Sequence, residues 1–191
     1  MKSPDKRVEI MQVALELLAE LGFHRAPMSM IARKAEVAVG TIYLYFASKD
    51  ELITELYTEL EKKLVATLRE GFPTEGPIRE RFLHLIREIL FYFIENHLDF
   101  RYIEQYINSP YGIPLHRDRV LGKPGHGDIV MDLFTRGIAE RIVKDLPMAV
   151  LFSVSFAPVI FLAREHVLGF INLDEPLIKQ AAEACWDAIK R

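Results

Sequence analysis

The sequence offers little basis for a disulfide, a zinc site or a membrane span. Its 191 residues include one cysteine, Cys185, which excludes an internal disulfide, and no Cys and His cluster has zinc-binding spacing. The most apolar stretch, Ala149 to Ala163, is followed by Arg164 and Glu165 and is shorter than the roughly 20 residues that a membrane helix needs. Charged residues within the first ten positions argue against a signal peptide. We therefore expect a cytoplasmic protein without a membrane partner.

Patterns of enzyme sites are also missing. The six histidines are scattered without metal-ligand intervals, and the sequence has neither a glycine-rich phosphate loop nor a nucleophile motif around Cys185. We expect no catalytic residue, no metal, no cofactor and hence no enzyme. Neither sign of charge dominates, since the net charge is -3. Residues 1–50 are slightly basic and the remainder is acidic. A basic excess confined to one end is compatible with a nucleic-acid contact there.

Helical periodicity, in contrast, runs through the whole chain. Half of the residues are hydrophobic and 27% are charged, a balance typical of soluble globular proteins. Apolar residues recur at intervals of three and four, and no segment alternates as a strand does. The sequence predicts an all-α fold, with an N-terminal domain of three helices over residues 1–50, a connecting helix over 48–70 and a helical C-terminal domain over 71–191.

Glycine and proline separate the expected helices. Gly22 stands where the first helix should end, and Pro27 opens the second. Residues 110–127 are rich in both residue types and predict an irregular loop, whereas Pro158 predicts a bend inside an apolar helix. The expected helices cover roughly residues 8–21, 27–35, 40–47, 48–70, 78–97, 99–108, 128–143, 147–170 and 175–190.

Residues 27–46 have the layout of a helix-turn-helix, in which one short helix supports a second whose first residues reach the major groove of DNA. Hydroxyl groups that suit phosphate, two cations and a glycine that permits close backbone approach would face outward. The outward residues are Arg33, Ala38, Gly40, Thr41, Tyr43, Tyr45 and Lys49. A small core beneath them would contain Leu18, Ile31, Ala35, Val37, Ile42 and Phe46. The tyrosines would equally fit a module that merely half-buries them, and the spacing does not separate the two interpretations.

The run from Gly40 to Leu52, GTIYLYFASKDEL, resembles the recognition-helix signature of the TetR family of repressors. Gly22-Phe23 and residues 31–35 lie at the intervals that this family shows, so the resemblance covers about residues 8–55. It implies a DNA-binding domain at the N-terminus. It further implies DNA-backbone contacts from Thr41, Tyr45 and Lys49, base or backbone contacts from Ser29, Val39, Gly40 and Tyr43, and a further contact from Arg33.

Four positions depart from the family pattern. Ala26 stands where a capping Ser or Thr is usual, and its absence costs the second helix about 1 kcal/mol. Glu36 replaces the usual glycine of the turn and disfavours a left-handed conformation there. Ala38 and Val39 replace a polar pair, so we expect apolar contacts from them, for example with thymine methyl groups.

The resemblance also implies that residues 77–191 bind a ligand and form a dimer. The segment 147–170 is apolar almost all round and needs a cover on both sides. Together with 175–190 it could form a four-helix interface, so that residues 147–190 make a homodimer, although an intrachain core helix is nearly as compatible. Aromatic density in this half suits a small apolar effector. The candidate lining consists of Phe93, His97, Tyr106, Phe134 and Ser155.

The function predicted from these features is that of a transcriptional regulator, a repressor released from a palindromic operator on double-stranded DNA when an apolar effector shifts the helix over 48–70. Activation uses the same grip on DNA and stays open. The alternative is a helical protein-interaction module without sequence-specific DNA binding, which the acidic remainder of the chain favours and the recognition-helix run disfavours.

Overall fold

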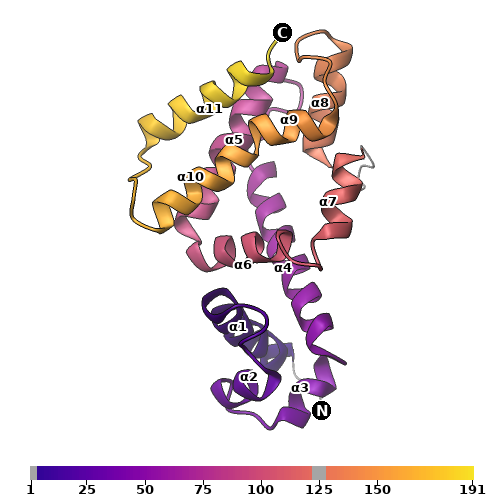
Figure 1. The fold of residues 1–191 in the computed structure, drawn as a ribbon, viewed down its shortest axis with the longest axis vertical. Coiled ribbons are helices and arrows are strands. Elements are labelled where there is room, and N and C mark those ends of the chain that lie inside the picture. The colour runs from indigo at the N-terminus through magenta and orange to yellow at the C-terminus, as the bar shows by residue number, and fades with distance from the viewer. Residues whose placement is uncertain (1–3, 122–127) are drawn as a thin grey trace. The chain divides into compact units, whose positions relative to one another are not determined.

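The computed structural model describes residues 4–121 and 128–191, and these ranges are helical with no named strand (Figure 1). The predicted all-α class is thereby confirmed. The helices are α1 (Pro4–Leu21), α2 (Met28–Lys34), α3 (Val39–Tyr45), α4 (Lys49–Arg69), α5 (Ile78–Glu95), α6 (His97–Ile107), α7 (Ile113–Val120), α8 (Ile129–Ala139), α9 (Met148–Ser155), α10 (Ala157–Val167) and α11 (Glu175–Ile189).

The chain divides into two compact units. Unit 1 comprises Met1–Lys63 and Asn96–Tyr111, and unit 2 comprises Leu64–Glu95 and Gly112–Arg191. The helix α4 contributes residues to both units, and α6 belongs to the unit of the first three helices. The sequence assigned the residues of α6 to the C-terminal domain, because nothing in their own pattern shows that they pack on α1. The functional division at residues 50 and 71 stays a prediction.

Unit 1 is built on a small apolar core between α1, α2 and α3. Gly22 ends α1 in the left-handed conformation with φ 85°, as a helix-terminating glycine does. The predicted core residues Leu18, Ile31, Ala35, Ile42 and Phe46 are buried, while Val37 is half-buried. This core fixes the second helix of the pair, α3, against the first.

The start of α4 is capped by a hydroxyl group and a carboxylate. The backbone N–H of Glu51 donates to Ser48 Oγ at 3.1 Å, and the Glu51 carboxylate accepts from the backbone N–H of Ala47. This reciprocal pair satisfies two amides that the helix itself leaves free. The helix that connects the two units is therefore anchored directly after α3.

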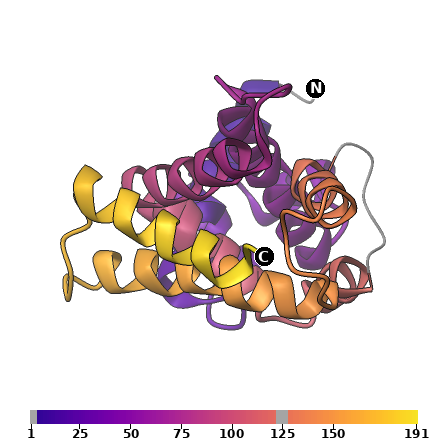
Figure 2. The same ribbon diagram turned by 90° about the horizontal axis from the view of Figure 1, so that it is seen from above.

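Unit 2 is arranged around α5. The helices α8, α10 and α11 pack against α5, and Figures 1 and 2 show α11 running alongside the α9–α10 pair. The ring of Phe82, from α5, lies 6.0 Å from that of Phe156 and 5.5 Å from that of Trp186. Asp128 caps α8 by accepting from the N–H groups of Val130 and Met131. Aromatic packing thus joins the helices that the sequence predicted.

Two expected segments differ in the structure. Part of the predicted loop 110–127 is the helix α7, because Gly112 and Pro114 lie at its start, where proline is tolerated. Residues 122–127 of that loop lie outside the described residues. The predicted helix 147–170 is two helices that meet at Phe156, since Pro158 in the first turn of α10 has no N–H to continue α9. Where a bend at Pro158 was expected, the helix is interrupted at Phe156, which keeps right-handed helical backbone angles. The proline expected inside the second helix, Pro27, precedes α2 as its extended N-cap.

The α9–α10 pair is the most apolar part of the described chain. Over Met148–Val167 the mean hydropathy reaches 1.6, enough by length and composition for a membrane span, yet only 22% of this stretch is buried within the chain. Length and composition alone are weak evidence for a span. The large apolar residues that stay exposed here and in the following turn are Val150, Val154, Phe161, Leu168 and Phe170.

Candidate nucleic-acid interface

The outer face of α3 is the surface on which the predicted DNA-contacting residues lie. Exposed fractions are 38% for Val39 and 51% for Tyr43, and Ala38 and Gly40 are also exposed. No heavy atom lies within 4 Å of a Cβ built on Gly40, so its backbone is open to close approach. Ser29 and Arg33, on α2, are exposed as well, whereas Thr41 and Tyr45 are half-buried.

One exposed residue of α3 was missed. Leu44 is 59% exposed, more than Tyr43 on the same helix. It lies four positions after Gly40 and therefore on the same helical face. The spacing carries this signal, although the outward face was predicted to hold mainly hydroxyl-bearing residues. An exposed leucine makes the outer face of α3 less polar than expected.

The turn before α3 is a Schellman motif. The N–H of Val37 donates to the Ala32 carbonyl at 3.0 Å and that of Glu36 donates to the Arg33 carbonyl at 3.3 Å, the bonds that define this helix ending. Glu36 adopts φ 54°, the left-handed conformation that the sequence analysis considered disfavoured for it. The turn therefore keeps the geometry that glycine usually supplies, and the glutamate carries the strain.

Lys49 has a partner inside unit 1. Its ammonium donates to the backbone carbonyl of Phe23, which follows the end of α1. Partial burial lowers the pKa of Lys49 because desolvation disfavours the charged form. The residue thus joins the start of α4 to the end of α1, and its predicted contact with the DNA backbone would have to coexist with this bond.

Other cations of unit 1 are also engaged. Lys34 lies 2.9 Å from the carboxylate of Glu16, which lowers the pKa of Glu16 through the hydrogen bond, and Arg7 pairs with Glu55. These ion pairs link α2 and α4 to α1. Arg33, the neighbouring residue on α2, is exposed as well.

An aromatic cluster ties α6 to the rest of unit 1. The Tyr102 hydroxyl donates to the Ile53 carbonyl at 2.8 Å, and Gln105 Nε2 donates to the Ala19 carbonyl at 2.9 Å. The rings of Tyr57 and Tyr106 stack with centroids 3.9 Å apart. Burial raises the pKa of Tyr102 and of Tyr106. Because α6 bonds to both α1 and α4, it braces the scaffold that holds α3.

The candidate effector-lining residues fall in both units. His97 and Tyr106 belong to unit 1, whereas Phe93, Phe134 and Ser155 belong to unit 2. His97 is exposed, so its expected place in an inward-facing lining is wrong. It is the first residue of α6 and comes before the first buried residue of that helix. The Ser155 hydroxyl donates to the Leu151 carbonyl of its own helix at 2.5 Å. A lining made of these residues stays a prediction.

A short helix pair that exposes the second helix on a buried core is the architecture of helix-turn-helix DNA-binding proteins. Family models match both parts of the chain: "Bacterial regulatory proteins, tetR family" over residues 10–56 and "Tetracyclin repressor-like, C-terminal domain" over residues 77–190. The chain belongs to the TetR family. It is accordingly a DNA-binding transcriptional regulator.

Similar proteins cover the chain almost completely. An uncharacterized HTH-type transcriptional regulator of Haemophilus influenzae is 26% identical over 188 residues, which are 98% of this chain and 97% of the relative. A solved structure of a TetR-family regulator from Haemophilus influenzae has a TM-score of 0.79 at 26% identity, covering 98% and 97% of the two chains. A TetR-family protein of Vibrio parahaemolyticus has a TM-score of 0.77 at 31% identity, covering 97% and 99%.

Metal-binding side chains do not gather in the described parts of the chain. Within residues 4–121 and 128–191, no group of three His, Cys, Asp or Glu side chains is placed to hold a metal ion. The matched family consists of transcriptional regulators, which are not enzymes. The candidate DNA-recognition surface of the chain is the outer face of α3.

Proposed function

We propose that this regulator is a cytoplasmic repressor that binds a palindromic operator as a homodimer and leaves it when a small effector enters unit 2. The observation that carries the DNA contact is the exposed outer face of α3, where Val39, Gly40, Tyr43 and Leu44 lie on a helix fixed from below by Ile42 and Phe46. Apolar side chains and tyrosines of this face suit thymine methyl groups and phosphates.

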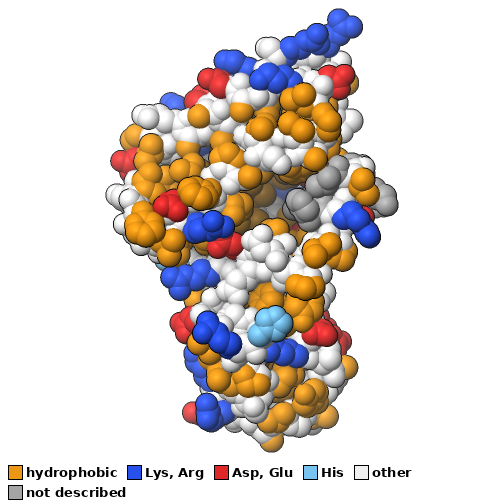
Figure 3. Space-filling view, viewed as in Figure 1, with side chains coloured by type: hydrophobic (Ala, Val, Ile, Leu, Met, Phe, Trp, Pro, Cys, Tyr) orange, Lys and Arg blue, Asp and Glu red, His pale blue; other side chains and the backbone are white. Residues whose placement is uncertain are grey.

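The homodimer is supported by the uncovered apolar surface of α9 and α10. Hydrophobic side chains gather over α10 in Figure 3, and Phe161 and Leu168 are 55% and 54% exposed. Exposed apolar residues that lie together on one element mark an interaction surface. In a dimer with a two-fold axis, this surface of one copy would pack against the same surface of the other copy. The two recognition helices would then face half-sites about 35 Å apart.

Effector control is supported by the continuity of α4. Residues 49–63 of this helix belong to unit 1 and residues 64–69 to unit 2. A displacement of its second part is transmitted along a continuous helix to the residues that follow α3. Because both half-sites must be met together, a change of a few ångströms in the separation of the recognition helices weakens both contacts.

Selection from random DNA duplexes tests the proposed operator binding. Purified protein is incubated with the pool, bound duplexes are recovered over several rounds and sequenced, and the variant Tyr43→Ala is treated in parallel. We expect an inverted repeat from the unaltered protein and no enrichment with Tyr43→Ala, because this half-exposed side chain packs little within its own chain and contributes mainly to DNA.

The matched control is Val8→Ala, which truncates a 63% exposed side chain on α1 that is not among the predicted DNA-contacting residues. It should select the same repeat as the unaltered protein. Equal enrichment by Tyr43→Ala, or an enriched sequence without two-fold symmetry, would contradict the proposed grip.

A further inference from the structure

The described residues of unit 2 contain one buried cation. Arg81, in the first part of α5, is 3% exposed, and it is the sole Lys or Arg in the described parts of the chain that is fully buried. Its Nη2 donates to Asp132 Oδ2, on α8, at 2.8 Å. The side chain of Asp132 is 54% exposed. The ion pair therefore lies at the edge of unit 2, where Arg81 is buried and Asp132 reaches solvent.

Most of the hydrogen-bonding capacity of Arg81 is unused. A guanidinium carries five N–H donors, and neither Nε nor Nη1 of Arg81 has an acceptor among the described residues. Leaving buried donors of a charged group unsatisfied costs more than leaving neutral ones. An acceptor beyond the described residues, such as water or an anion, would complete this group.

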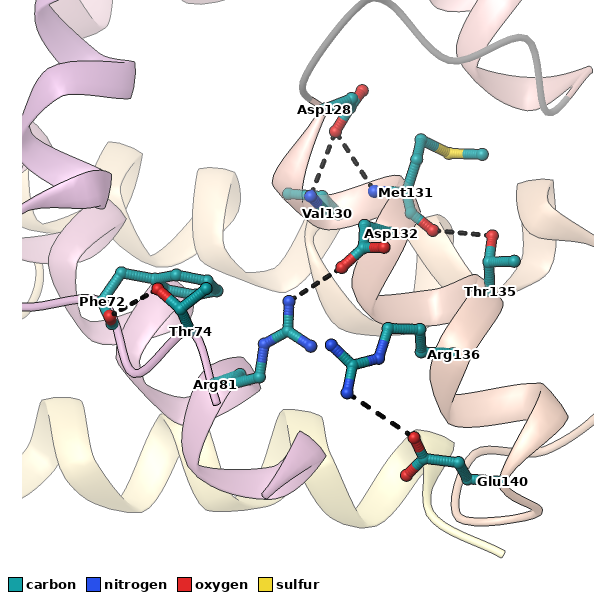
Figure 4. Close-up of polar contacts among 10 residues, drawn as sticks. All are labelled: Phe72, Thr74, Arg81, Asp128, Val130, Met131, Asp132, Thr135, Arg136 and Glu140. Carbon is teal, nitrogen blue, oxygen red and sulfur yellow. Dashed lines mark hydrogen bonds and ion pairs between the residues drawn. The ribbon is translucent and has the colours of Figure 1, made fainter. Parts of the chain in front are cut away.

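The surroundings favour an anion over water. The Phe72 ring lies 5.2 Å from Arg81 Cζ on one side, which excludes solvent there. On the other side, Figure 4 shows the guanidinium of Arg136 pointing toward Arg81, and its own acid, Glu140, is 3.8 Å away and 47% exposed. Each guanidinium already pairs with one carboxylate, Asp132 or Glu140. The unused N–H donors of Arg81 still suit a group with two acceptor oxygens better than a single water.

We propose that Arg81 anchors the carboxylate of an organic acid, so that the effector of this regulator is an acid rather than a neutral apolar molecule. The planar fork of arginine matches the two oxygens of a carboxylate. This inference rests on the proposed effector control of unit 2. It adds the charge of the ligand and the residue that recognises it, which none of the five predicted lining residues supplies.

Access to Arg81 requires only a local change. The turn that carries Phe72 is closed by short-range backbone bonds, from Phe72 to Arg69, from Thr74 to Phe72 and from Gly76 to Pro73. A turn held by bonds between near neighbours can move without breaking the contacts of the helices it joins. The same turn connects α4 to α5, so a ligand seated on Arg81 lies beside the end of the helix that unit 1 shares.

The first test observes Arg81 directly in the full-length protein without DNA. The Nε–H resonance of Arg81, assigned by comparison with Arg81→Lys, is followed by NMR during titration with butyrate, benzoate and decanoate and with the corresponding alcohols. We expect at least one acid, and no alcohol, to shift this resonance. An unchanged resonance with all three acids, or a shift produced by inorganic phosphate alone at the same ionic strength, would overturn the carboxylate assignment.

The second test measures affinity. By calorimetry, the acid that shifts Arg81 should bind the unaltered protein about 10- to 100-fold more tightly than its alcohol, the range expected for a charged hydrogen bond. The preference should disappear in Arg81→Met and persist in Arg79→Met, which removes an exposed arginine of the same helix that pairs with Glu183. An unaltered preference in Arg81→Met overturns the proposal. If Arg81→Met does not fold, the NMR titration decides.

These tests are separate from the operator selection. Acid binding at Arg81 without recovery of an inverted repeat would support the anion site and contradict the proposed repression. Recovery of the repeat, with Arg81 unaffected by every acid, would do the reverse.

Discussion

Glu36 holds a backbone conformation that costs an L-residue about 1–2 kcal/mol. Its φ of 54° lies in the region where glycine is free of a Cβ clash, and its side chain is exposed. We expect Glu36→Gly to raise the free energy of unfolding by about 0.5–1 kcal/mol. The relief of backbone strain is partly offset by the greater entropy of glycine in the unfolded chain. Denaturant unfolding at equilibrium measures this.

The control for that variant is Glu36→Ala, which removes the carboxylate and keeps the Cβ. It should leave stability nearly unchanged. If alanine stabilises as much as glycine, charge and not backbone strain is the cause, and the account of the turn is wrong.

Lys49 shows how a predicted DNA contact acquires a structural partner. We expect Lys49→Ala to lower the free energy of unfolding by about 1 kcal/mol, because the Phe23 carbonyl loses a charged donor in a partly buried place. The matched control is Lys62→Ala, which removes an exposed lysine of the same helix paired with Glu59 and should cost less than about 0.5 kcal/mol. Equal losses in the two variants would contradict the role of the Phe23 bond.

At the scale of elements, α6 and the turn after it stabilise unit 1. Tyr111, directly after this helix, donates its hydroxyl to Asp50 Oδ1 at 2.6 Å and packs its ring 5.9 Å from that of Phe23. One side chain therefore contacts the start of α4 and the end of α1. The hydrogen bond to the carboxylate, with burial, raises the pKa of Tyr111 to about 12.

This shift predicts a pH dependence. The folded protein holds the phenolic proton more tightly than the unfolded chain, whose tyrosine has a pKa near 10. The contribution of Tyr111 is therefore complete below pH 10 and is lost as the pH rises from 10 through 12. We expect stability to fall more steeply in this window for the unaltered protein than for Tyr111→Phe, as measured by denaturant unfolding. Tyr102 and Tyr106 remain in both proteins, so parallel curves would exclude Tyr111 as the source.

At the scale of the whole molecule, the proposed homodimer joins two chains through the α9–α10 surface, so that two recognition helices meet two half-sites. We expect Phe161→Glu to convert a dimer into a monomer, because it buries a charge in the proposed interface. Operator affinity should fall by about 100-fold or more, the scale on which joined sites gain over single ones. Analytical ultracentrifugation and a DNA-binding titration measure the two effects.

Ile113→Glu is the corresponding control, since Ile113 is 61% exposed on α7, outside the α9–α10 pair. It should stay dimeric with unchanged affinity. A dimeric Phe161→Glu would show that another surface joins the chains.

The sequence by itself determined the features that depend on near neighbours. Helical periodicity, the Ser48 cap and the Gly22 ending involve residues at most four apart, and the GTIYLYFASKDEL run identified the family through a contiguous segment. Such short-range patterns are readable because helix hydrogen bonds and caps join residues three or four positions apart.

Only the tertiary structure decided the contacts between distant positions. The bond from Lys49 to the Phe23 carbonyl spans 26 residues, that from Tyr102 to Ile53 spans 49, and the pair of Arg81 with Asp132 spans 51. Nothing in the local pattern of α5 distinguishes buried Arg81 from exposed Arg79. Burial depends on which helices pack together, and packing is settled by the whole set of apolar faces rather than by any one segment.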